Sequence, residues 1–225
     1  MAKKLPGMLV PLDEDIRNSE TFQKAITHRS ASNKNNERLE FLGDSVLNLV
    51  ISTYLYEQLP DIDEGGLSRL RSYLVKGETL AKIAAENNLG DYLKLGAGEL
   101  KSGGFRRHSI IEDAFEAIIG AVFLLRGFDY VQRYVLLLYT DYLDHLPSAD
   151  SLKDPKSRLQ EWLQSRGQSV PAYRVLDIAG EAHQQTFTAE CWIEGMNIRT
   201  QAKGSSRRKA EQRSAEKAFG IVTAS

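Results

Sequence analysis

The sequence predicts a two-domain protein, with an all-α domain over residues 1–147, a linker over residues 148–153 and a small α+β domain over residues 154–224. Three observations support this prediction. Through most of the first part, apolar residues recur at three- and four-residue steps, as in helices with one buried face. A short polar segment around Pro147 is typical of a linker. After it, apolar and polar residues alternate, which predicts strands.

The composition fits a folded protein without disulfides. The 225 residues are 42% hydrophobic, enough for one large or two smaller cores. Met1 to Leu12 lack the apolar core of a secretory signal, and no segment reaches the roughly 18 apolar residues that span a bilayer. Cys191 is the single cysteine, and no Cys/His cluster has the spacing of a zinc site. We therefore expect a cytoplasmic protein with no membrane partner.

The net charge of −1 conceals an asymmetry between the two parts. Residues 150–225 hold 12 Lys and Arg against 9 Asp and Glu, whereas residues 1–149 hold 17 against 21. A basic domain attached to an acidic one suggests that the basic C-terminal domain holds a polyanion and that the acidic N-terminal domain holds metal.

The first part reads as a series of helices separated by turns. The expected helices are one within residues 19–32 that ends near His28, followed by 37–59, 67–75, 78–88, 109–125 and 129–143. Residues 61–66 form a turn-rich acidic break, and residues 96–107 form a flexible basic loop. That loop matches neither glycine-rich nucleotide pattern. It is either an ordinary surface loop or a loop that contacts a phosphate backbone through Lys101, Arg106 or Arg107.

The helix over residues 37–59 carries an unusual row of acids. Glu37, Glu40 and Asp44 are spaced i, i+3 and i+7, so they share one strip and repel one another. One explanation is a solvated helix face. However, the strip adjoins a predicted buried stripe, and Gly43 would allow close approach by a backbone, an ion or a substrate. The stripe consists of Leu39, Leu42, Val46, Leu49 and Val50.

The helix over residues 109–125 also carries closely spaced acids on an apolar helix. Asp113 and Glu116 lie one turn apart near its middle, and small residues would allow it to pack closely against the first acidic helix. The small residues are Ala114, Ala117, Gly120 and Ala121. Carboxylates that converge in a partly buried place become tolerable when a hard cation such as Mg²⁺ neutralises them. Four acids on two crossing helices therefore predict a metal site.

The second part has the order α-β-β-β-α, with helices expected on one face of an antiparallel sheet. Its predicted elements are a helix over residues 156–166, strands over 173–178, 185–193 and 196–202, and a final helix from Ser206 to Val222. Basic and hydroxyl side chains gather at residues 203–209, where the start of the last helix favours phosphate. A basic run is commonly a solvated face, but this strand order favours nucleic acid.

Residues 37–45, Glu-Arg-Leu-Glu-Phe-Leu-Gly-Asp-Ser, resemble the signature of the ribonuclease III family. Residues 98–104 and 112–117 resemble its other nuclease motifs, and the C-terminal part resembles the double-stranded RNA-binding domain. The resemblance extends along nearly the full length and corresponds to the short bacterial form. It implies an all-α endonuclease domain followed by a double-stranded RNA-binding domain.

The resemblance also implies an activity. A homodimer would hydrolyse both strands of duplex RNA with two Mg²⁺ ions, for which Mn²⁺ could substitute. The cuts would leave 5′-phosphate and 3′-hydroxyl ends with short 3′ overhangs. Its substrates would be ribosomal RNA precursors, messenger RNAs and other structured transcripts, and no organic cofactor would be needed.

Particular residues match the family's functional positions. The resemblance implies metal binding by Glu40, Asp44, Asp113 and Glu116, with Asp44 and Glu116 closest to the chemistry. Glu37 and Glu64 match further catalytic acids that act at the RNA backbone beside the cut. Phe41 matches the aromatic residue that inserts into the partner subunit, the alternative being a core residue of one subunit.

In the RNA-binding domain, side chains can reach the minor grooves and the phosphates of A-form RNA. The resemblance implies minor-groove contacts by Gln160 and His183, although His183 could be a plain turn residue. Phosphate contacts would come from Lys203, Arg207, Arg208 and Lys209. This predicts recognition of shape with a strong salt dependence.

Two other functions fit parts of the sequence. A duplex-RNA binder whose helical domain only dimerises is disfavoured by the complete set of four carboxylates. A phosphohydrolase acting on small nucleotides is disfavoured by the attached RNA-binding domain.

Overall fold

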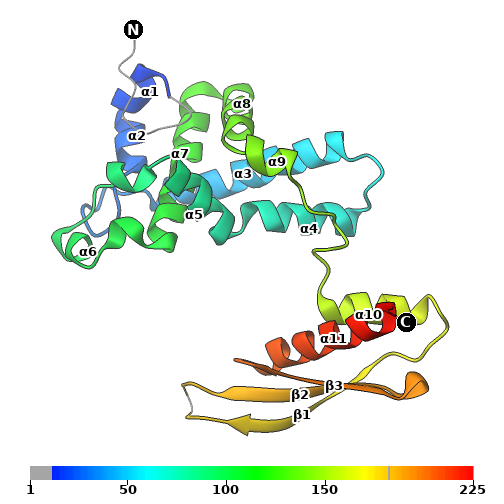
Figure 1. Ribbon diagram of the computed structural model, residues 1–225. Helices are drawn as coiled ribbons and strands as arrows, with labels where there is room; N and C mark the ends of the chain where they lie inside the picture. Colours follow the sequence, from blue (N-terminus) through cyan, green and yellow to red (C-terminus); the bar gives the residue numbers. More distant parts are fainter. Residues whose placement is uncertain (1–11, 182, 225) are drawn as a thin grey trace. The chain divides into compact units, whose positions relative to one another are not determined.

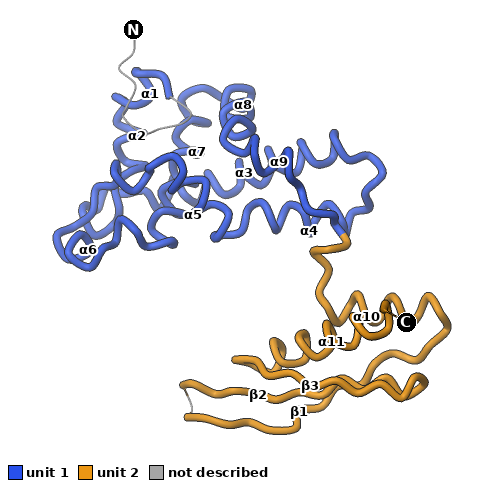
Figure 2. The backbone as a smooth tube through the Cα atoms, in the orientation of Figure 1, with its two compact units in different colours: residues 1–149 blue, residues 150–225 orange. Residues whose placement is uncertain are grey.

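The computed structural model describes residues 12–181 and 183–224, and the chain divides into two compact units, residues 1–149 and 150–225 (Figure 2). The first unit is helical and the second combines helices with a sheet, so the predicted fold class is confirmed. The sequence-based statement about a secretory signal falls almost wholly on residues outside the described ones. No helix in the described ranges has the length and apolar character needed to cross a membrane.

The first unit contains two long helices, α3 and α7, and several shorter ones (Figure 1). The helices are α1 Glu14–Asn18, α2 Glu20–Ala25, α3 Glu37–Gln58, α4 Glu64–Val75, α5 Gly77–Glu86, α6 Ala97–Lys101, α7 His108–Arg126, α8 Phe128–Leu138 and α9 Thr140–Asp144, with 3₁₀ turns at Leu89–Tyr92 and Gly104–Arg106. Helix α7 packs against α3 on one side and against α2, α5 and α8 on others, so it is the centre of this unit.

Helix α3 buries a stripe that differs in part from the prediction. Val46, Leu47, Val50 and Ile51 are buried, whereas Leu49, which the sequence analysis placed in the stripe, is 54% exposed. Successive helical residues are rotated by about 100°, and the buried arc is centred on the side of Leu47. Leu49 therefore lies beyond its edge.

The crossing of α3 and α7 brings two backbones into contact. A Cβ atom on Gly43 would lie 1.8 Å from the carbonyl oxygen of Glu116, and a Cβ on Gly120 would lie 2.4 Å from the carbonyl oxygen of Leu39. Each glycine is therefore required by the backbone of the opposite helix. Of the three explanations for Gly43, close approach by another backbone is confirmed.

Three further local expectations were wrong. Helix α4 begins at Glu64, inside the expected break, because the Asp63 side chain accepts a hydrogen bond from the Gly66 N–H at 2.7 Å and caps it. The expected loop over residues 96–107 contains α6 and a 3₁₀ turn, which an ion pair between Arg107 and Glu99 at 3.1 Å ties together. The helix expected over residues 129–143 is divided at Tyr139, a fully buried residue.

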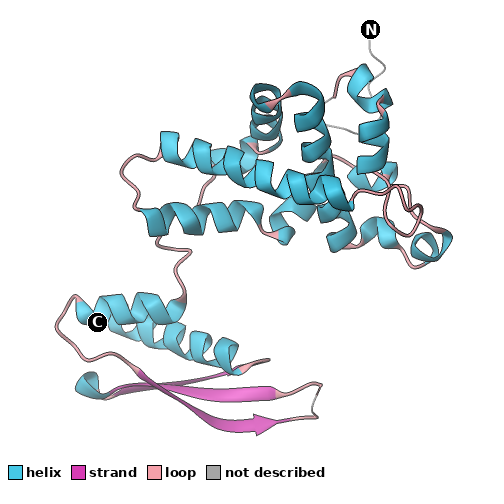
Figure 3. Ribbon diagram, turned by 180° about the vertical axis from the view of Figure 1, so that it is seen from behind, coloured by secondary structure: helices cyan, strands magenta, loops and turns pink. Residues whose placement is uncertain are grey.

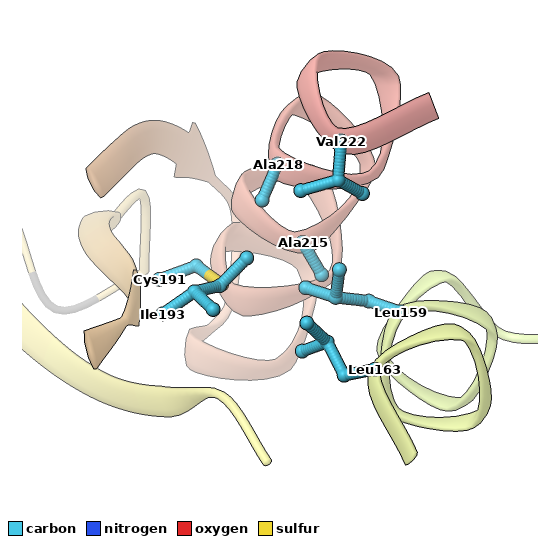
Figure 4. Close-up of a cluster of buried hydrophobic side chains, with 7 residues drawn as sticks. All are labelled: Leu159, Leu163, Cys191, Ile193, Ala215, Ala218 and Val222. Carbon is cyan, nitrogen blue, oxygen red and sulfur yellow. The ribbon is translucent and has the colours of Figure 1, made fainter. Parts of the chain in front are cut away.

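The second unit has the predicted order, with α10 Pro155–Gln164, β1 Ala172–Ala179, β2 Thr186–Ile193, β3 Ile198–Gly204 and α11 Arg207–Ala224. The strands form an antiparallel sheet in the order β1-β2-β3, and both helices cover one of its faces (Figure 3). The core between helices and sheet is formed by Leu159, Leu163, Cys191, Ile193, Ala215, Ala218 and Val222 (Figure 4). Cys191 is buried in this core.

We predict that Gly43→Ala destabilises the helical unit by about 3 kcal/mol, the upper part of the usual range for overpacked cores, because the new methyl group meets a backbone that cannot rotate away. Urea unfolding measures the change. Gly98→Ala is the matched control, since a Cβ there meets nothing within 4 Å. Equal stability of the two variants would contradict the close helix contact.

Candidate active site

The α3–α7 crossing gathers four of the predicted site residues. Glu40 and Asp44 flank Gly43 on α3, and the carbonyl of Glu116 on α7 lies against Gly43 itself. Asp113 lies one turn before Glu116 on α7. The backbone contact therefore forces the carboxylates of two helices into one region. We call these four residues the carboxylate cluster.

The electrostatics of Glu116 show how closely the acids are grouped. Burial raises its pKa, and the negative charges of Asp44, Glu112, Glu40 and Asp113 raise it further, to about 8. Its carboxyl group is therefore largely protonated at neutral pH unless a positive charge is supplied.

Glu40 and Asp113 experience the same environment. Burial raises the pKa of Glu40, and the charge of Asp113 adds to this effect. Burial also raises the pKa of Asp113, although the charges of His28 and Arg29 oppose the rise. A group of partly buried, mutually repelling carboxylates is the environment that a divalent cation stabilises.

The donor atoms of this cluster suit a hard cation. Carboxylate oxygens are the ligands that Mg²⁺ and Mn²⁺ accept. Within residues 12–181 and 183–224, no three His, Cys, Asp or Glu side chains converge closely enough to hold an ion as they stand. Repulsion between uncompensated carboxylates opposes such convergence. The chemistry of the residues present therefore fits a hard divalent cation, and these four carboxylates would hold it.

Two residues next to the cluster, Asn48 and Glu112, were not assigned a role by the sequence analysis. The Asn48 side chain donates hydrogen bonds to Asp44 Oδ1 at 2.8 Å and to the Asp44 carbonyl at 2.9 Å, which fixes the carboxylate of Asp44. Their i, i+4 spacing was a signal for this contact. Glu112 lies against α5, where a Cβ on Gly77 would be 2.4 Å from Glu112 Oε2. Burial and Asp113 raise the pKa of Glu112.

The other two predicted acids differ in their distance from the cluster: the charge of Glu37 raises the pKa of Glu40 and Asp113, whereas Glu64 lies on α4. Glu37, at the start of α3, contacts Arg29 at 3.5 Å and Asn35 at 3.3 Å. Glu64 hydrogen-bonds Ser68 at 2.9 Å and lines a groove of about 700 Å³ beside Ser52. Ser52 is eight residues beyond Asp44, roughly 12 Å along the helix. The structure therefore places Glu64 apart from the four carboxylates of its own chain.

Phe41 is not a core residue, because its side chain is 78% exposed on α3. This excludes the alternative that it fills the core of one subunit. It borders a surface groove of about 950 Å³, which Leu42 and Leu124 also line. Leu124 is itself 58% exposed, so this face of the helical unit carries apolar side chains without cover in the part of the chain that the structure describes.

The predicted RNA-binding side chains are exposed on the second unit. Gln160 lies on α10, His183 precedes β2, Lys203 is on β3, and Arg207, Arg208 and Lys209 open α11. Ser206 Oγ accepts a hydrogen bond from the Lys209 N–H at 3.2 Å, which caps this helix.

Buried Glu211 organises the start of α11. It accepts hydrogen bonds from Arg207 Nε and Lys156 Nζ, both at 2.8 Å. Burial alone would raise the pKa of Glu211, but Arg207 and Lys156 hold it below its usual value. The sequence analysis missed Lys156 and Glu211 because their contact spans 55 residues.

We predict that Glu116→Gln stabilises the metal-free protein above pH 8. Because the folded pKa of Glu116 exceeds its unfolded value of 4.5, the folded state binds more protons between pH 4.5 and 8, and wild-type stability falls as the pH rises through this window. Gln carries no such cost. After allowance for solvent screening of a partly exposed group, we expect a gain of about 1–2 kcal/mol.

Urea unfolding in EDTA at several pH values measures the difference between Glu116→Gln and wild type. It should be small below pH 4.5 and grow toward pH 8. A difference that is constant with pH would contradict the raised pKa.

Family models match both units of the chain. Residues 18–143 match the Ribonuclease-III-like family, and residues 155–220 match the double-stranded RNA binding motif. Two curated relatives, each named Ribonuclease 3, come from Vibrio vulnificus strains CMCP6 and YJ016. Each is 53% identical to this chain over 212 residues, which is 94% of this chain and 94% of the relative.

Solved structures agree with this assignment. One structure of the nuclease domain of ribonuclease III from Campylobacter jejuni is 39% identical with a TM-score of 0.56, covering 59% of this chain and 99% of that one. Another from the same organism is 42% identical with a TM-score of 0.54, covering 56% and 87%. Helical fold, acidic helix crossing, RNA-binding motif and these relatives agree: the chain belongs to the ribonuclease III family of endonucleases.

Proposed function

We propose that this chain cleaves double-stranded RNA by metal-dependent hydrolysis at the carboxylate cluster. The observation that carries the proposal is the placement of Glu40, Asp44, Asp113 and Glu116 at one helix crossing, where burial and mutual repulsion raise the pKa of Glu116 to about 8. Oxygen ligands in such a setting favour two Mg²⁺ ions, with Mn²⁺ as a substitute.

Each part of the chain has a separate task in this proposal. Glu40, Asp44, Asp113 and Glu116 hold the ions, and Asn48 keeps the Asp44 carboxylate oriented. Bound divalent ions lower the pKa of an attacking water and stabilise charge on the phosphate and the leaving oxygen. The products would be 5′-phosphate and 3′-hydroxyl ends with short 3′ overhangs.

Glu37 and Glu64 are proposed to act at the RNA backbone beside the cut. Their positions support such a role, because Glu37 is paired with Arg29 at the edge of the cluster, one turn before Glu40, and Glu64 lines a separate groove. They would therefore position the RNA backbone, while the four other acids hold the ions.

The second unit supplies the affinity for duplex RNA. Its family match supports RNA binding, and its exposed basic side chains suit phosphates on either side of a groove. Gln160 and His183 would reach minor grooves, and Lys203, Arg207, Arg208 and Lys209 would contact phosphates. We propose ribosomal RNA precursors, messenger RNAs and other structured transcripts as substrates, and the cytoplasm as the place of action.

A cleavage assay on labelled duplex RNA tests the proposal. We expect cutting with Mg²⁺, none with EDTA, and none of a single-stranded control. Glu116→Gln should lower the rate by at least about 1,000-fold, because several kcal/mol of charge stabilisation depend on the bound metal. Glu86→Gln, an exposed acid at the far end of α5, is the matched control. Duplex binding without cleavage in either metal would leave only an RNA-binding protein.

We also propose that the chain forms a homodimer through the face that carries Phe41. An aromatic side chain that is 78% exposed beside a 950 Å³ groove supports insertion into a second copy. One of the Campylobacter jejuni structures is described as flexible in a region involved in dimer formation of that nuclease domain.

Phe41→Ala should raise the dimer dissociation constant about 10- to 100-fold, since burying a Phe side chain contributes roughly 1.5–3 kcal/mol. Sedimentation at several protein concentrations measures the constant. Leu137→Ala, which removes another exposed apolar side chain on α8, should leave it unchanged. An equal effect of both variants would contradict a specific role of Phe41.

A further inference from the structure

His28 lies close to the carboxylate cluster but belongs to neither of the acidic helices. It follows α2, and the residues on either side of it contact the start of α3: the Thr27 carbonyl accepts a hydrogen bond from the Asn36 N–H at 2.9 Å, and Arg29 lies 3.5 Å from Glu37. The charge of His28 also opposes the rise in the pKa of Asp113. The distance exceeds that of an ion pair, because no described acid lies within 4.0 Å of its ring nitrogens. His28 therefore lies beside the start of α3, where Glu40 follows Glu37 by one turn, and makes no ion pair with the cluster.

The backbone around His28 is firmly held. The His28 N–H donates to the Lys94 carbonyl at 3.0 Å, and the Lys94 N–H donates to the Ile26 carbonyl at 2.8 Å. Thr27 and Lys94 form a parallel bridge, so the chain after α2 runs beside the segment that precedes α6 (Figure 1). His28 is thus fixed by a segment far away in the sequence.

The ring of His28 is also oriented. Its Nδ1 accepts the Ser30 N–H at 3.2 Å and lies 2.8 Å from Ser30 Oγ. Ser30 Oγ is held in turn by the Gly96 N–H at 2.9 Å, and a Cβ on Gly96 would lie 2.2 Å from the Ser30 carbonyl oxygen. Since Nδ1 accepts a hydrogen bond, the proton of the neutral ring is on Nε2.

The Nε2–H of His28 has no acceptor among the described residues, so it is free to donate a hydrogen bond to a ligand. The four carboxylates are ionised when they hold metal, and an ionised carboxylate accepts hydrogen bonds but donates none, so they cannot donate a hydrogen bond to an RNA phosphate. Arg29, the neighbouring cation, is engaged with Glu37 at 3.5 Å. His28 is therefore an oriented donor at the edge of an acidic site whose substrate is an anion.

We propose that His28 is a substrate-binding residue whose Nε2–H donates a hydrogen bond to a phosphate oxygen of the RNA at the carboxylate cluster. The role rests on the proposed cleavage of duplex RNA at that cluster. It places the 94–96 segment in the positioning machinery, because Lys94 and Gly96 hold His28 and Ser30 in place.

Single-turnover cleavage of duplex RNA in Mg²⁺ by four His variants tests the proposal. His28→Ala and His28→Asn should lower the rate constant divided by the half-saturating enzyme concentration about 10- to 100-fold, the range for a lost hydrogen bond to a charged group. His28→Gln should stay within about threefold of wild type, because its amide nitrogen can occupy the place of Nε2. His145→Ala, an exposed histidine at the end of α9, should have no effect.

A second measurement separates phosphate binding from an effect on the metal site. Mn²⁺ binding to the RNA-free variants, followed by electron paramagnetic resonance, should match wild type. If His28→Ala weakens Mn²⁺ binding in proportion to cleavage, the residue acts through Asp113 and the proposal is overturned. If His28→Ala does not fold, the proposal is still tested by comparing His28→Asn with His28→Gln. Both variants are first checked for wild-type thermal stability.

Two other outcomes would overturn the proposal, and a third would refute the proposed function on which it rests. Equal rates for His28→Asn and His28→Gln would overturn the proposal, because the position of the donor would then be irrelevant. Wild-type rates in all His28 variants would overturn it as well, while leaving the cleavage function intact. Failure of the wild-type protein to cut duplex RNA in any metal would refute the proposed function itself.

Discussion

The backbone contact between α3 and α7 is the constraint on which the rest of the helical unit depends. Gly43 and Gly120 lack side chains where each meets a carbonyl of the opposite helix, so the two helices approach as closely as their backbones allow. Because Glu40 and Asp44 adjoin one glycine and Glu116 supplies a contacting carbonyl, this approach also sets the spacing of the acids. The packing of the two helices and the spacing of the acids are thus set by the same few atoms.

This arrangement carries a cost in stability that the apolar core must offset. The raised pKa values of Glu40, Asp113 and Glu116 show that the ionised cluster is unfavourable in the metal-free fold. Helix α7 compensates with an almost continuous buried surface, including Ile118, Ile119 and Val122. A strained acidic group held by a well-packed helix is typical of a functional site, where ligand binding relieves the strain.

Periodicity predicted the long elements well, because burial along one face leaves a regular signal. Helix α3 was expected over residues 37–59 and is Glu37–Gln58, and α7 was expected over 109–125 and is His108–Arg126. The four clustered acids were found in the same way. Short α1 and α6 carry too few residues for a period, and only packing decided that Leu49 lies outside the buried arc.

The residues that the sequence analysis missed share a different property. Glu112 rests on Gly77, and Ser30 meets Gly96, across separations of 35 and 66 residues. Such contacts follow from the fold and leave no periodic pattern in one sequence. Asn48 is the exception, because its i, i+4 spacing from Asp44 was visible.

The RNA-binding unit shows why a count of basic residues overstates the charge available for phosphates. Arg207 is paired with buried Glu211, and Arg208 lies 3.9 Å from Asp154. Among the described residues, no acid pairs with Lys203 or Lys209. Salt dependence reports the phosphate charges that are neutralised on binding. The two lysines should therefore contribute more to it than the two arginines, whose positions Glu211 and Asp154 help to fix.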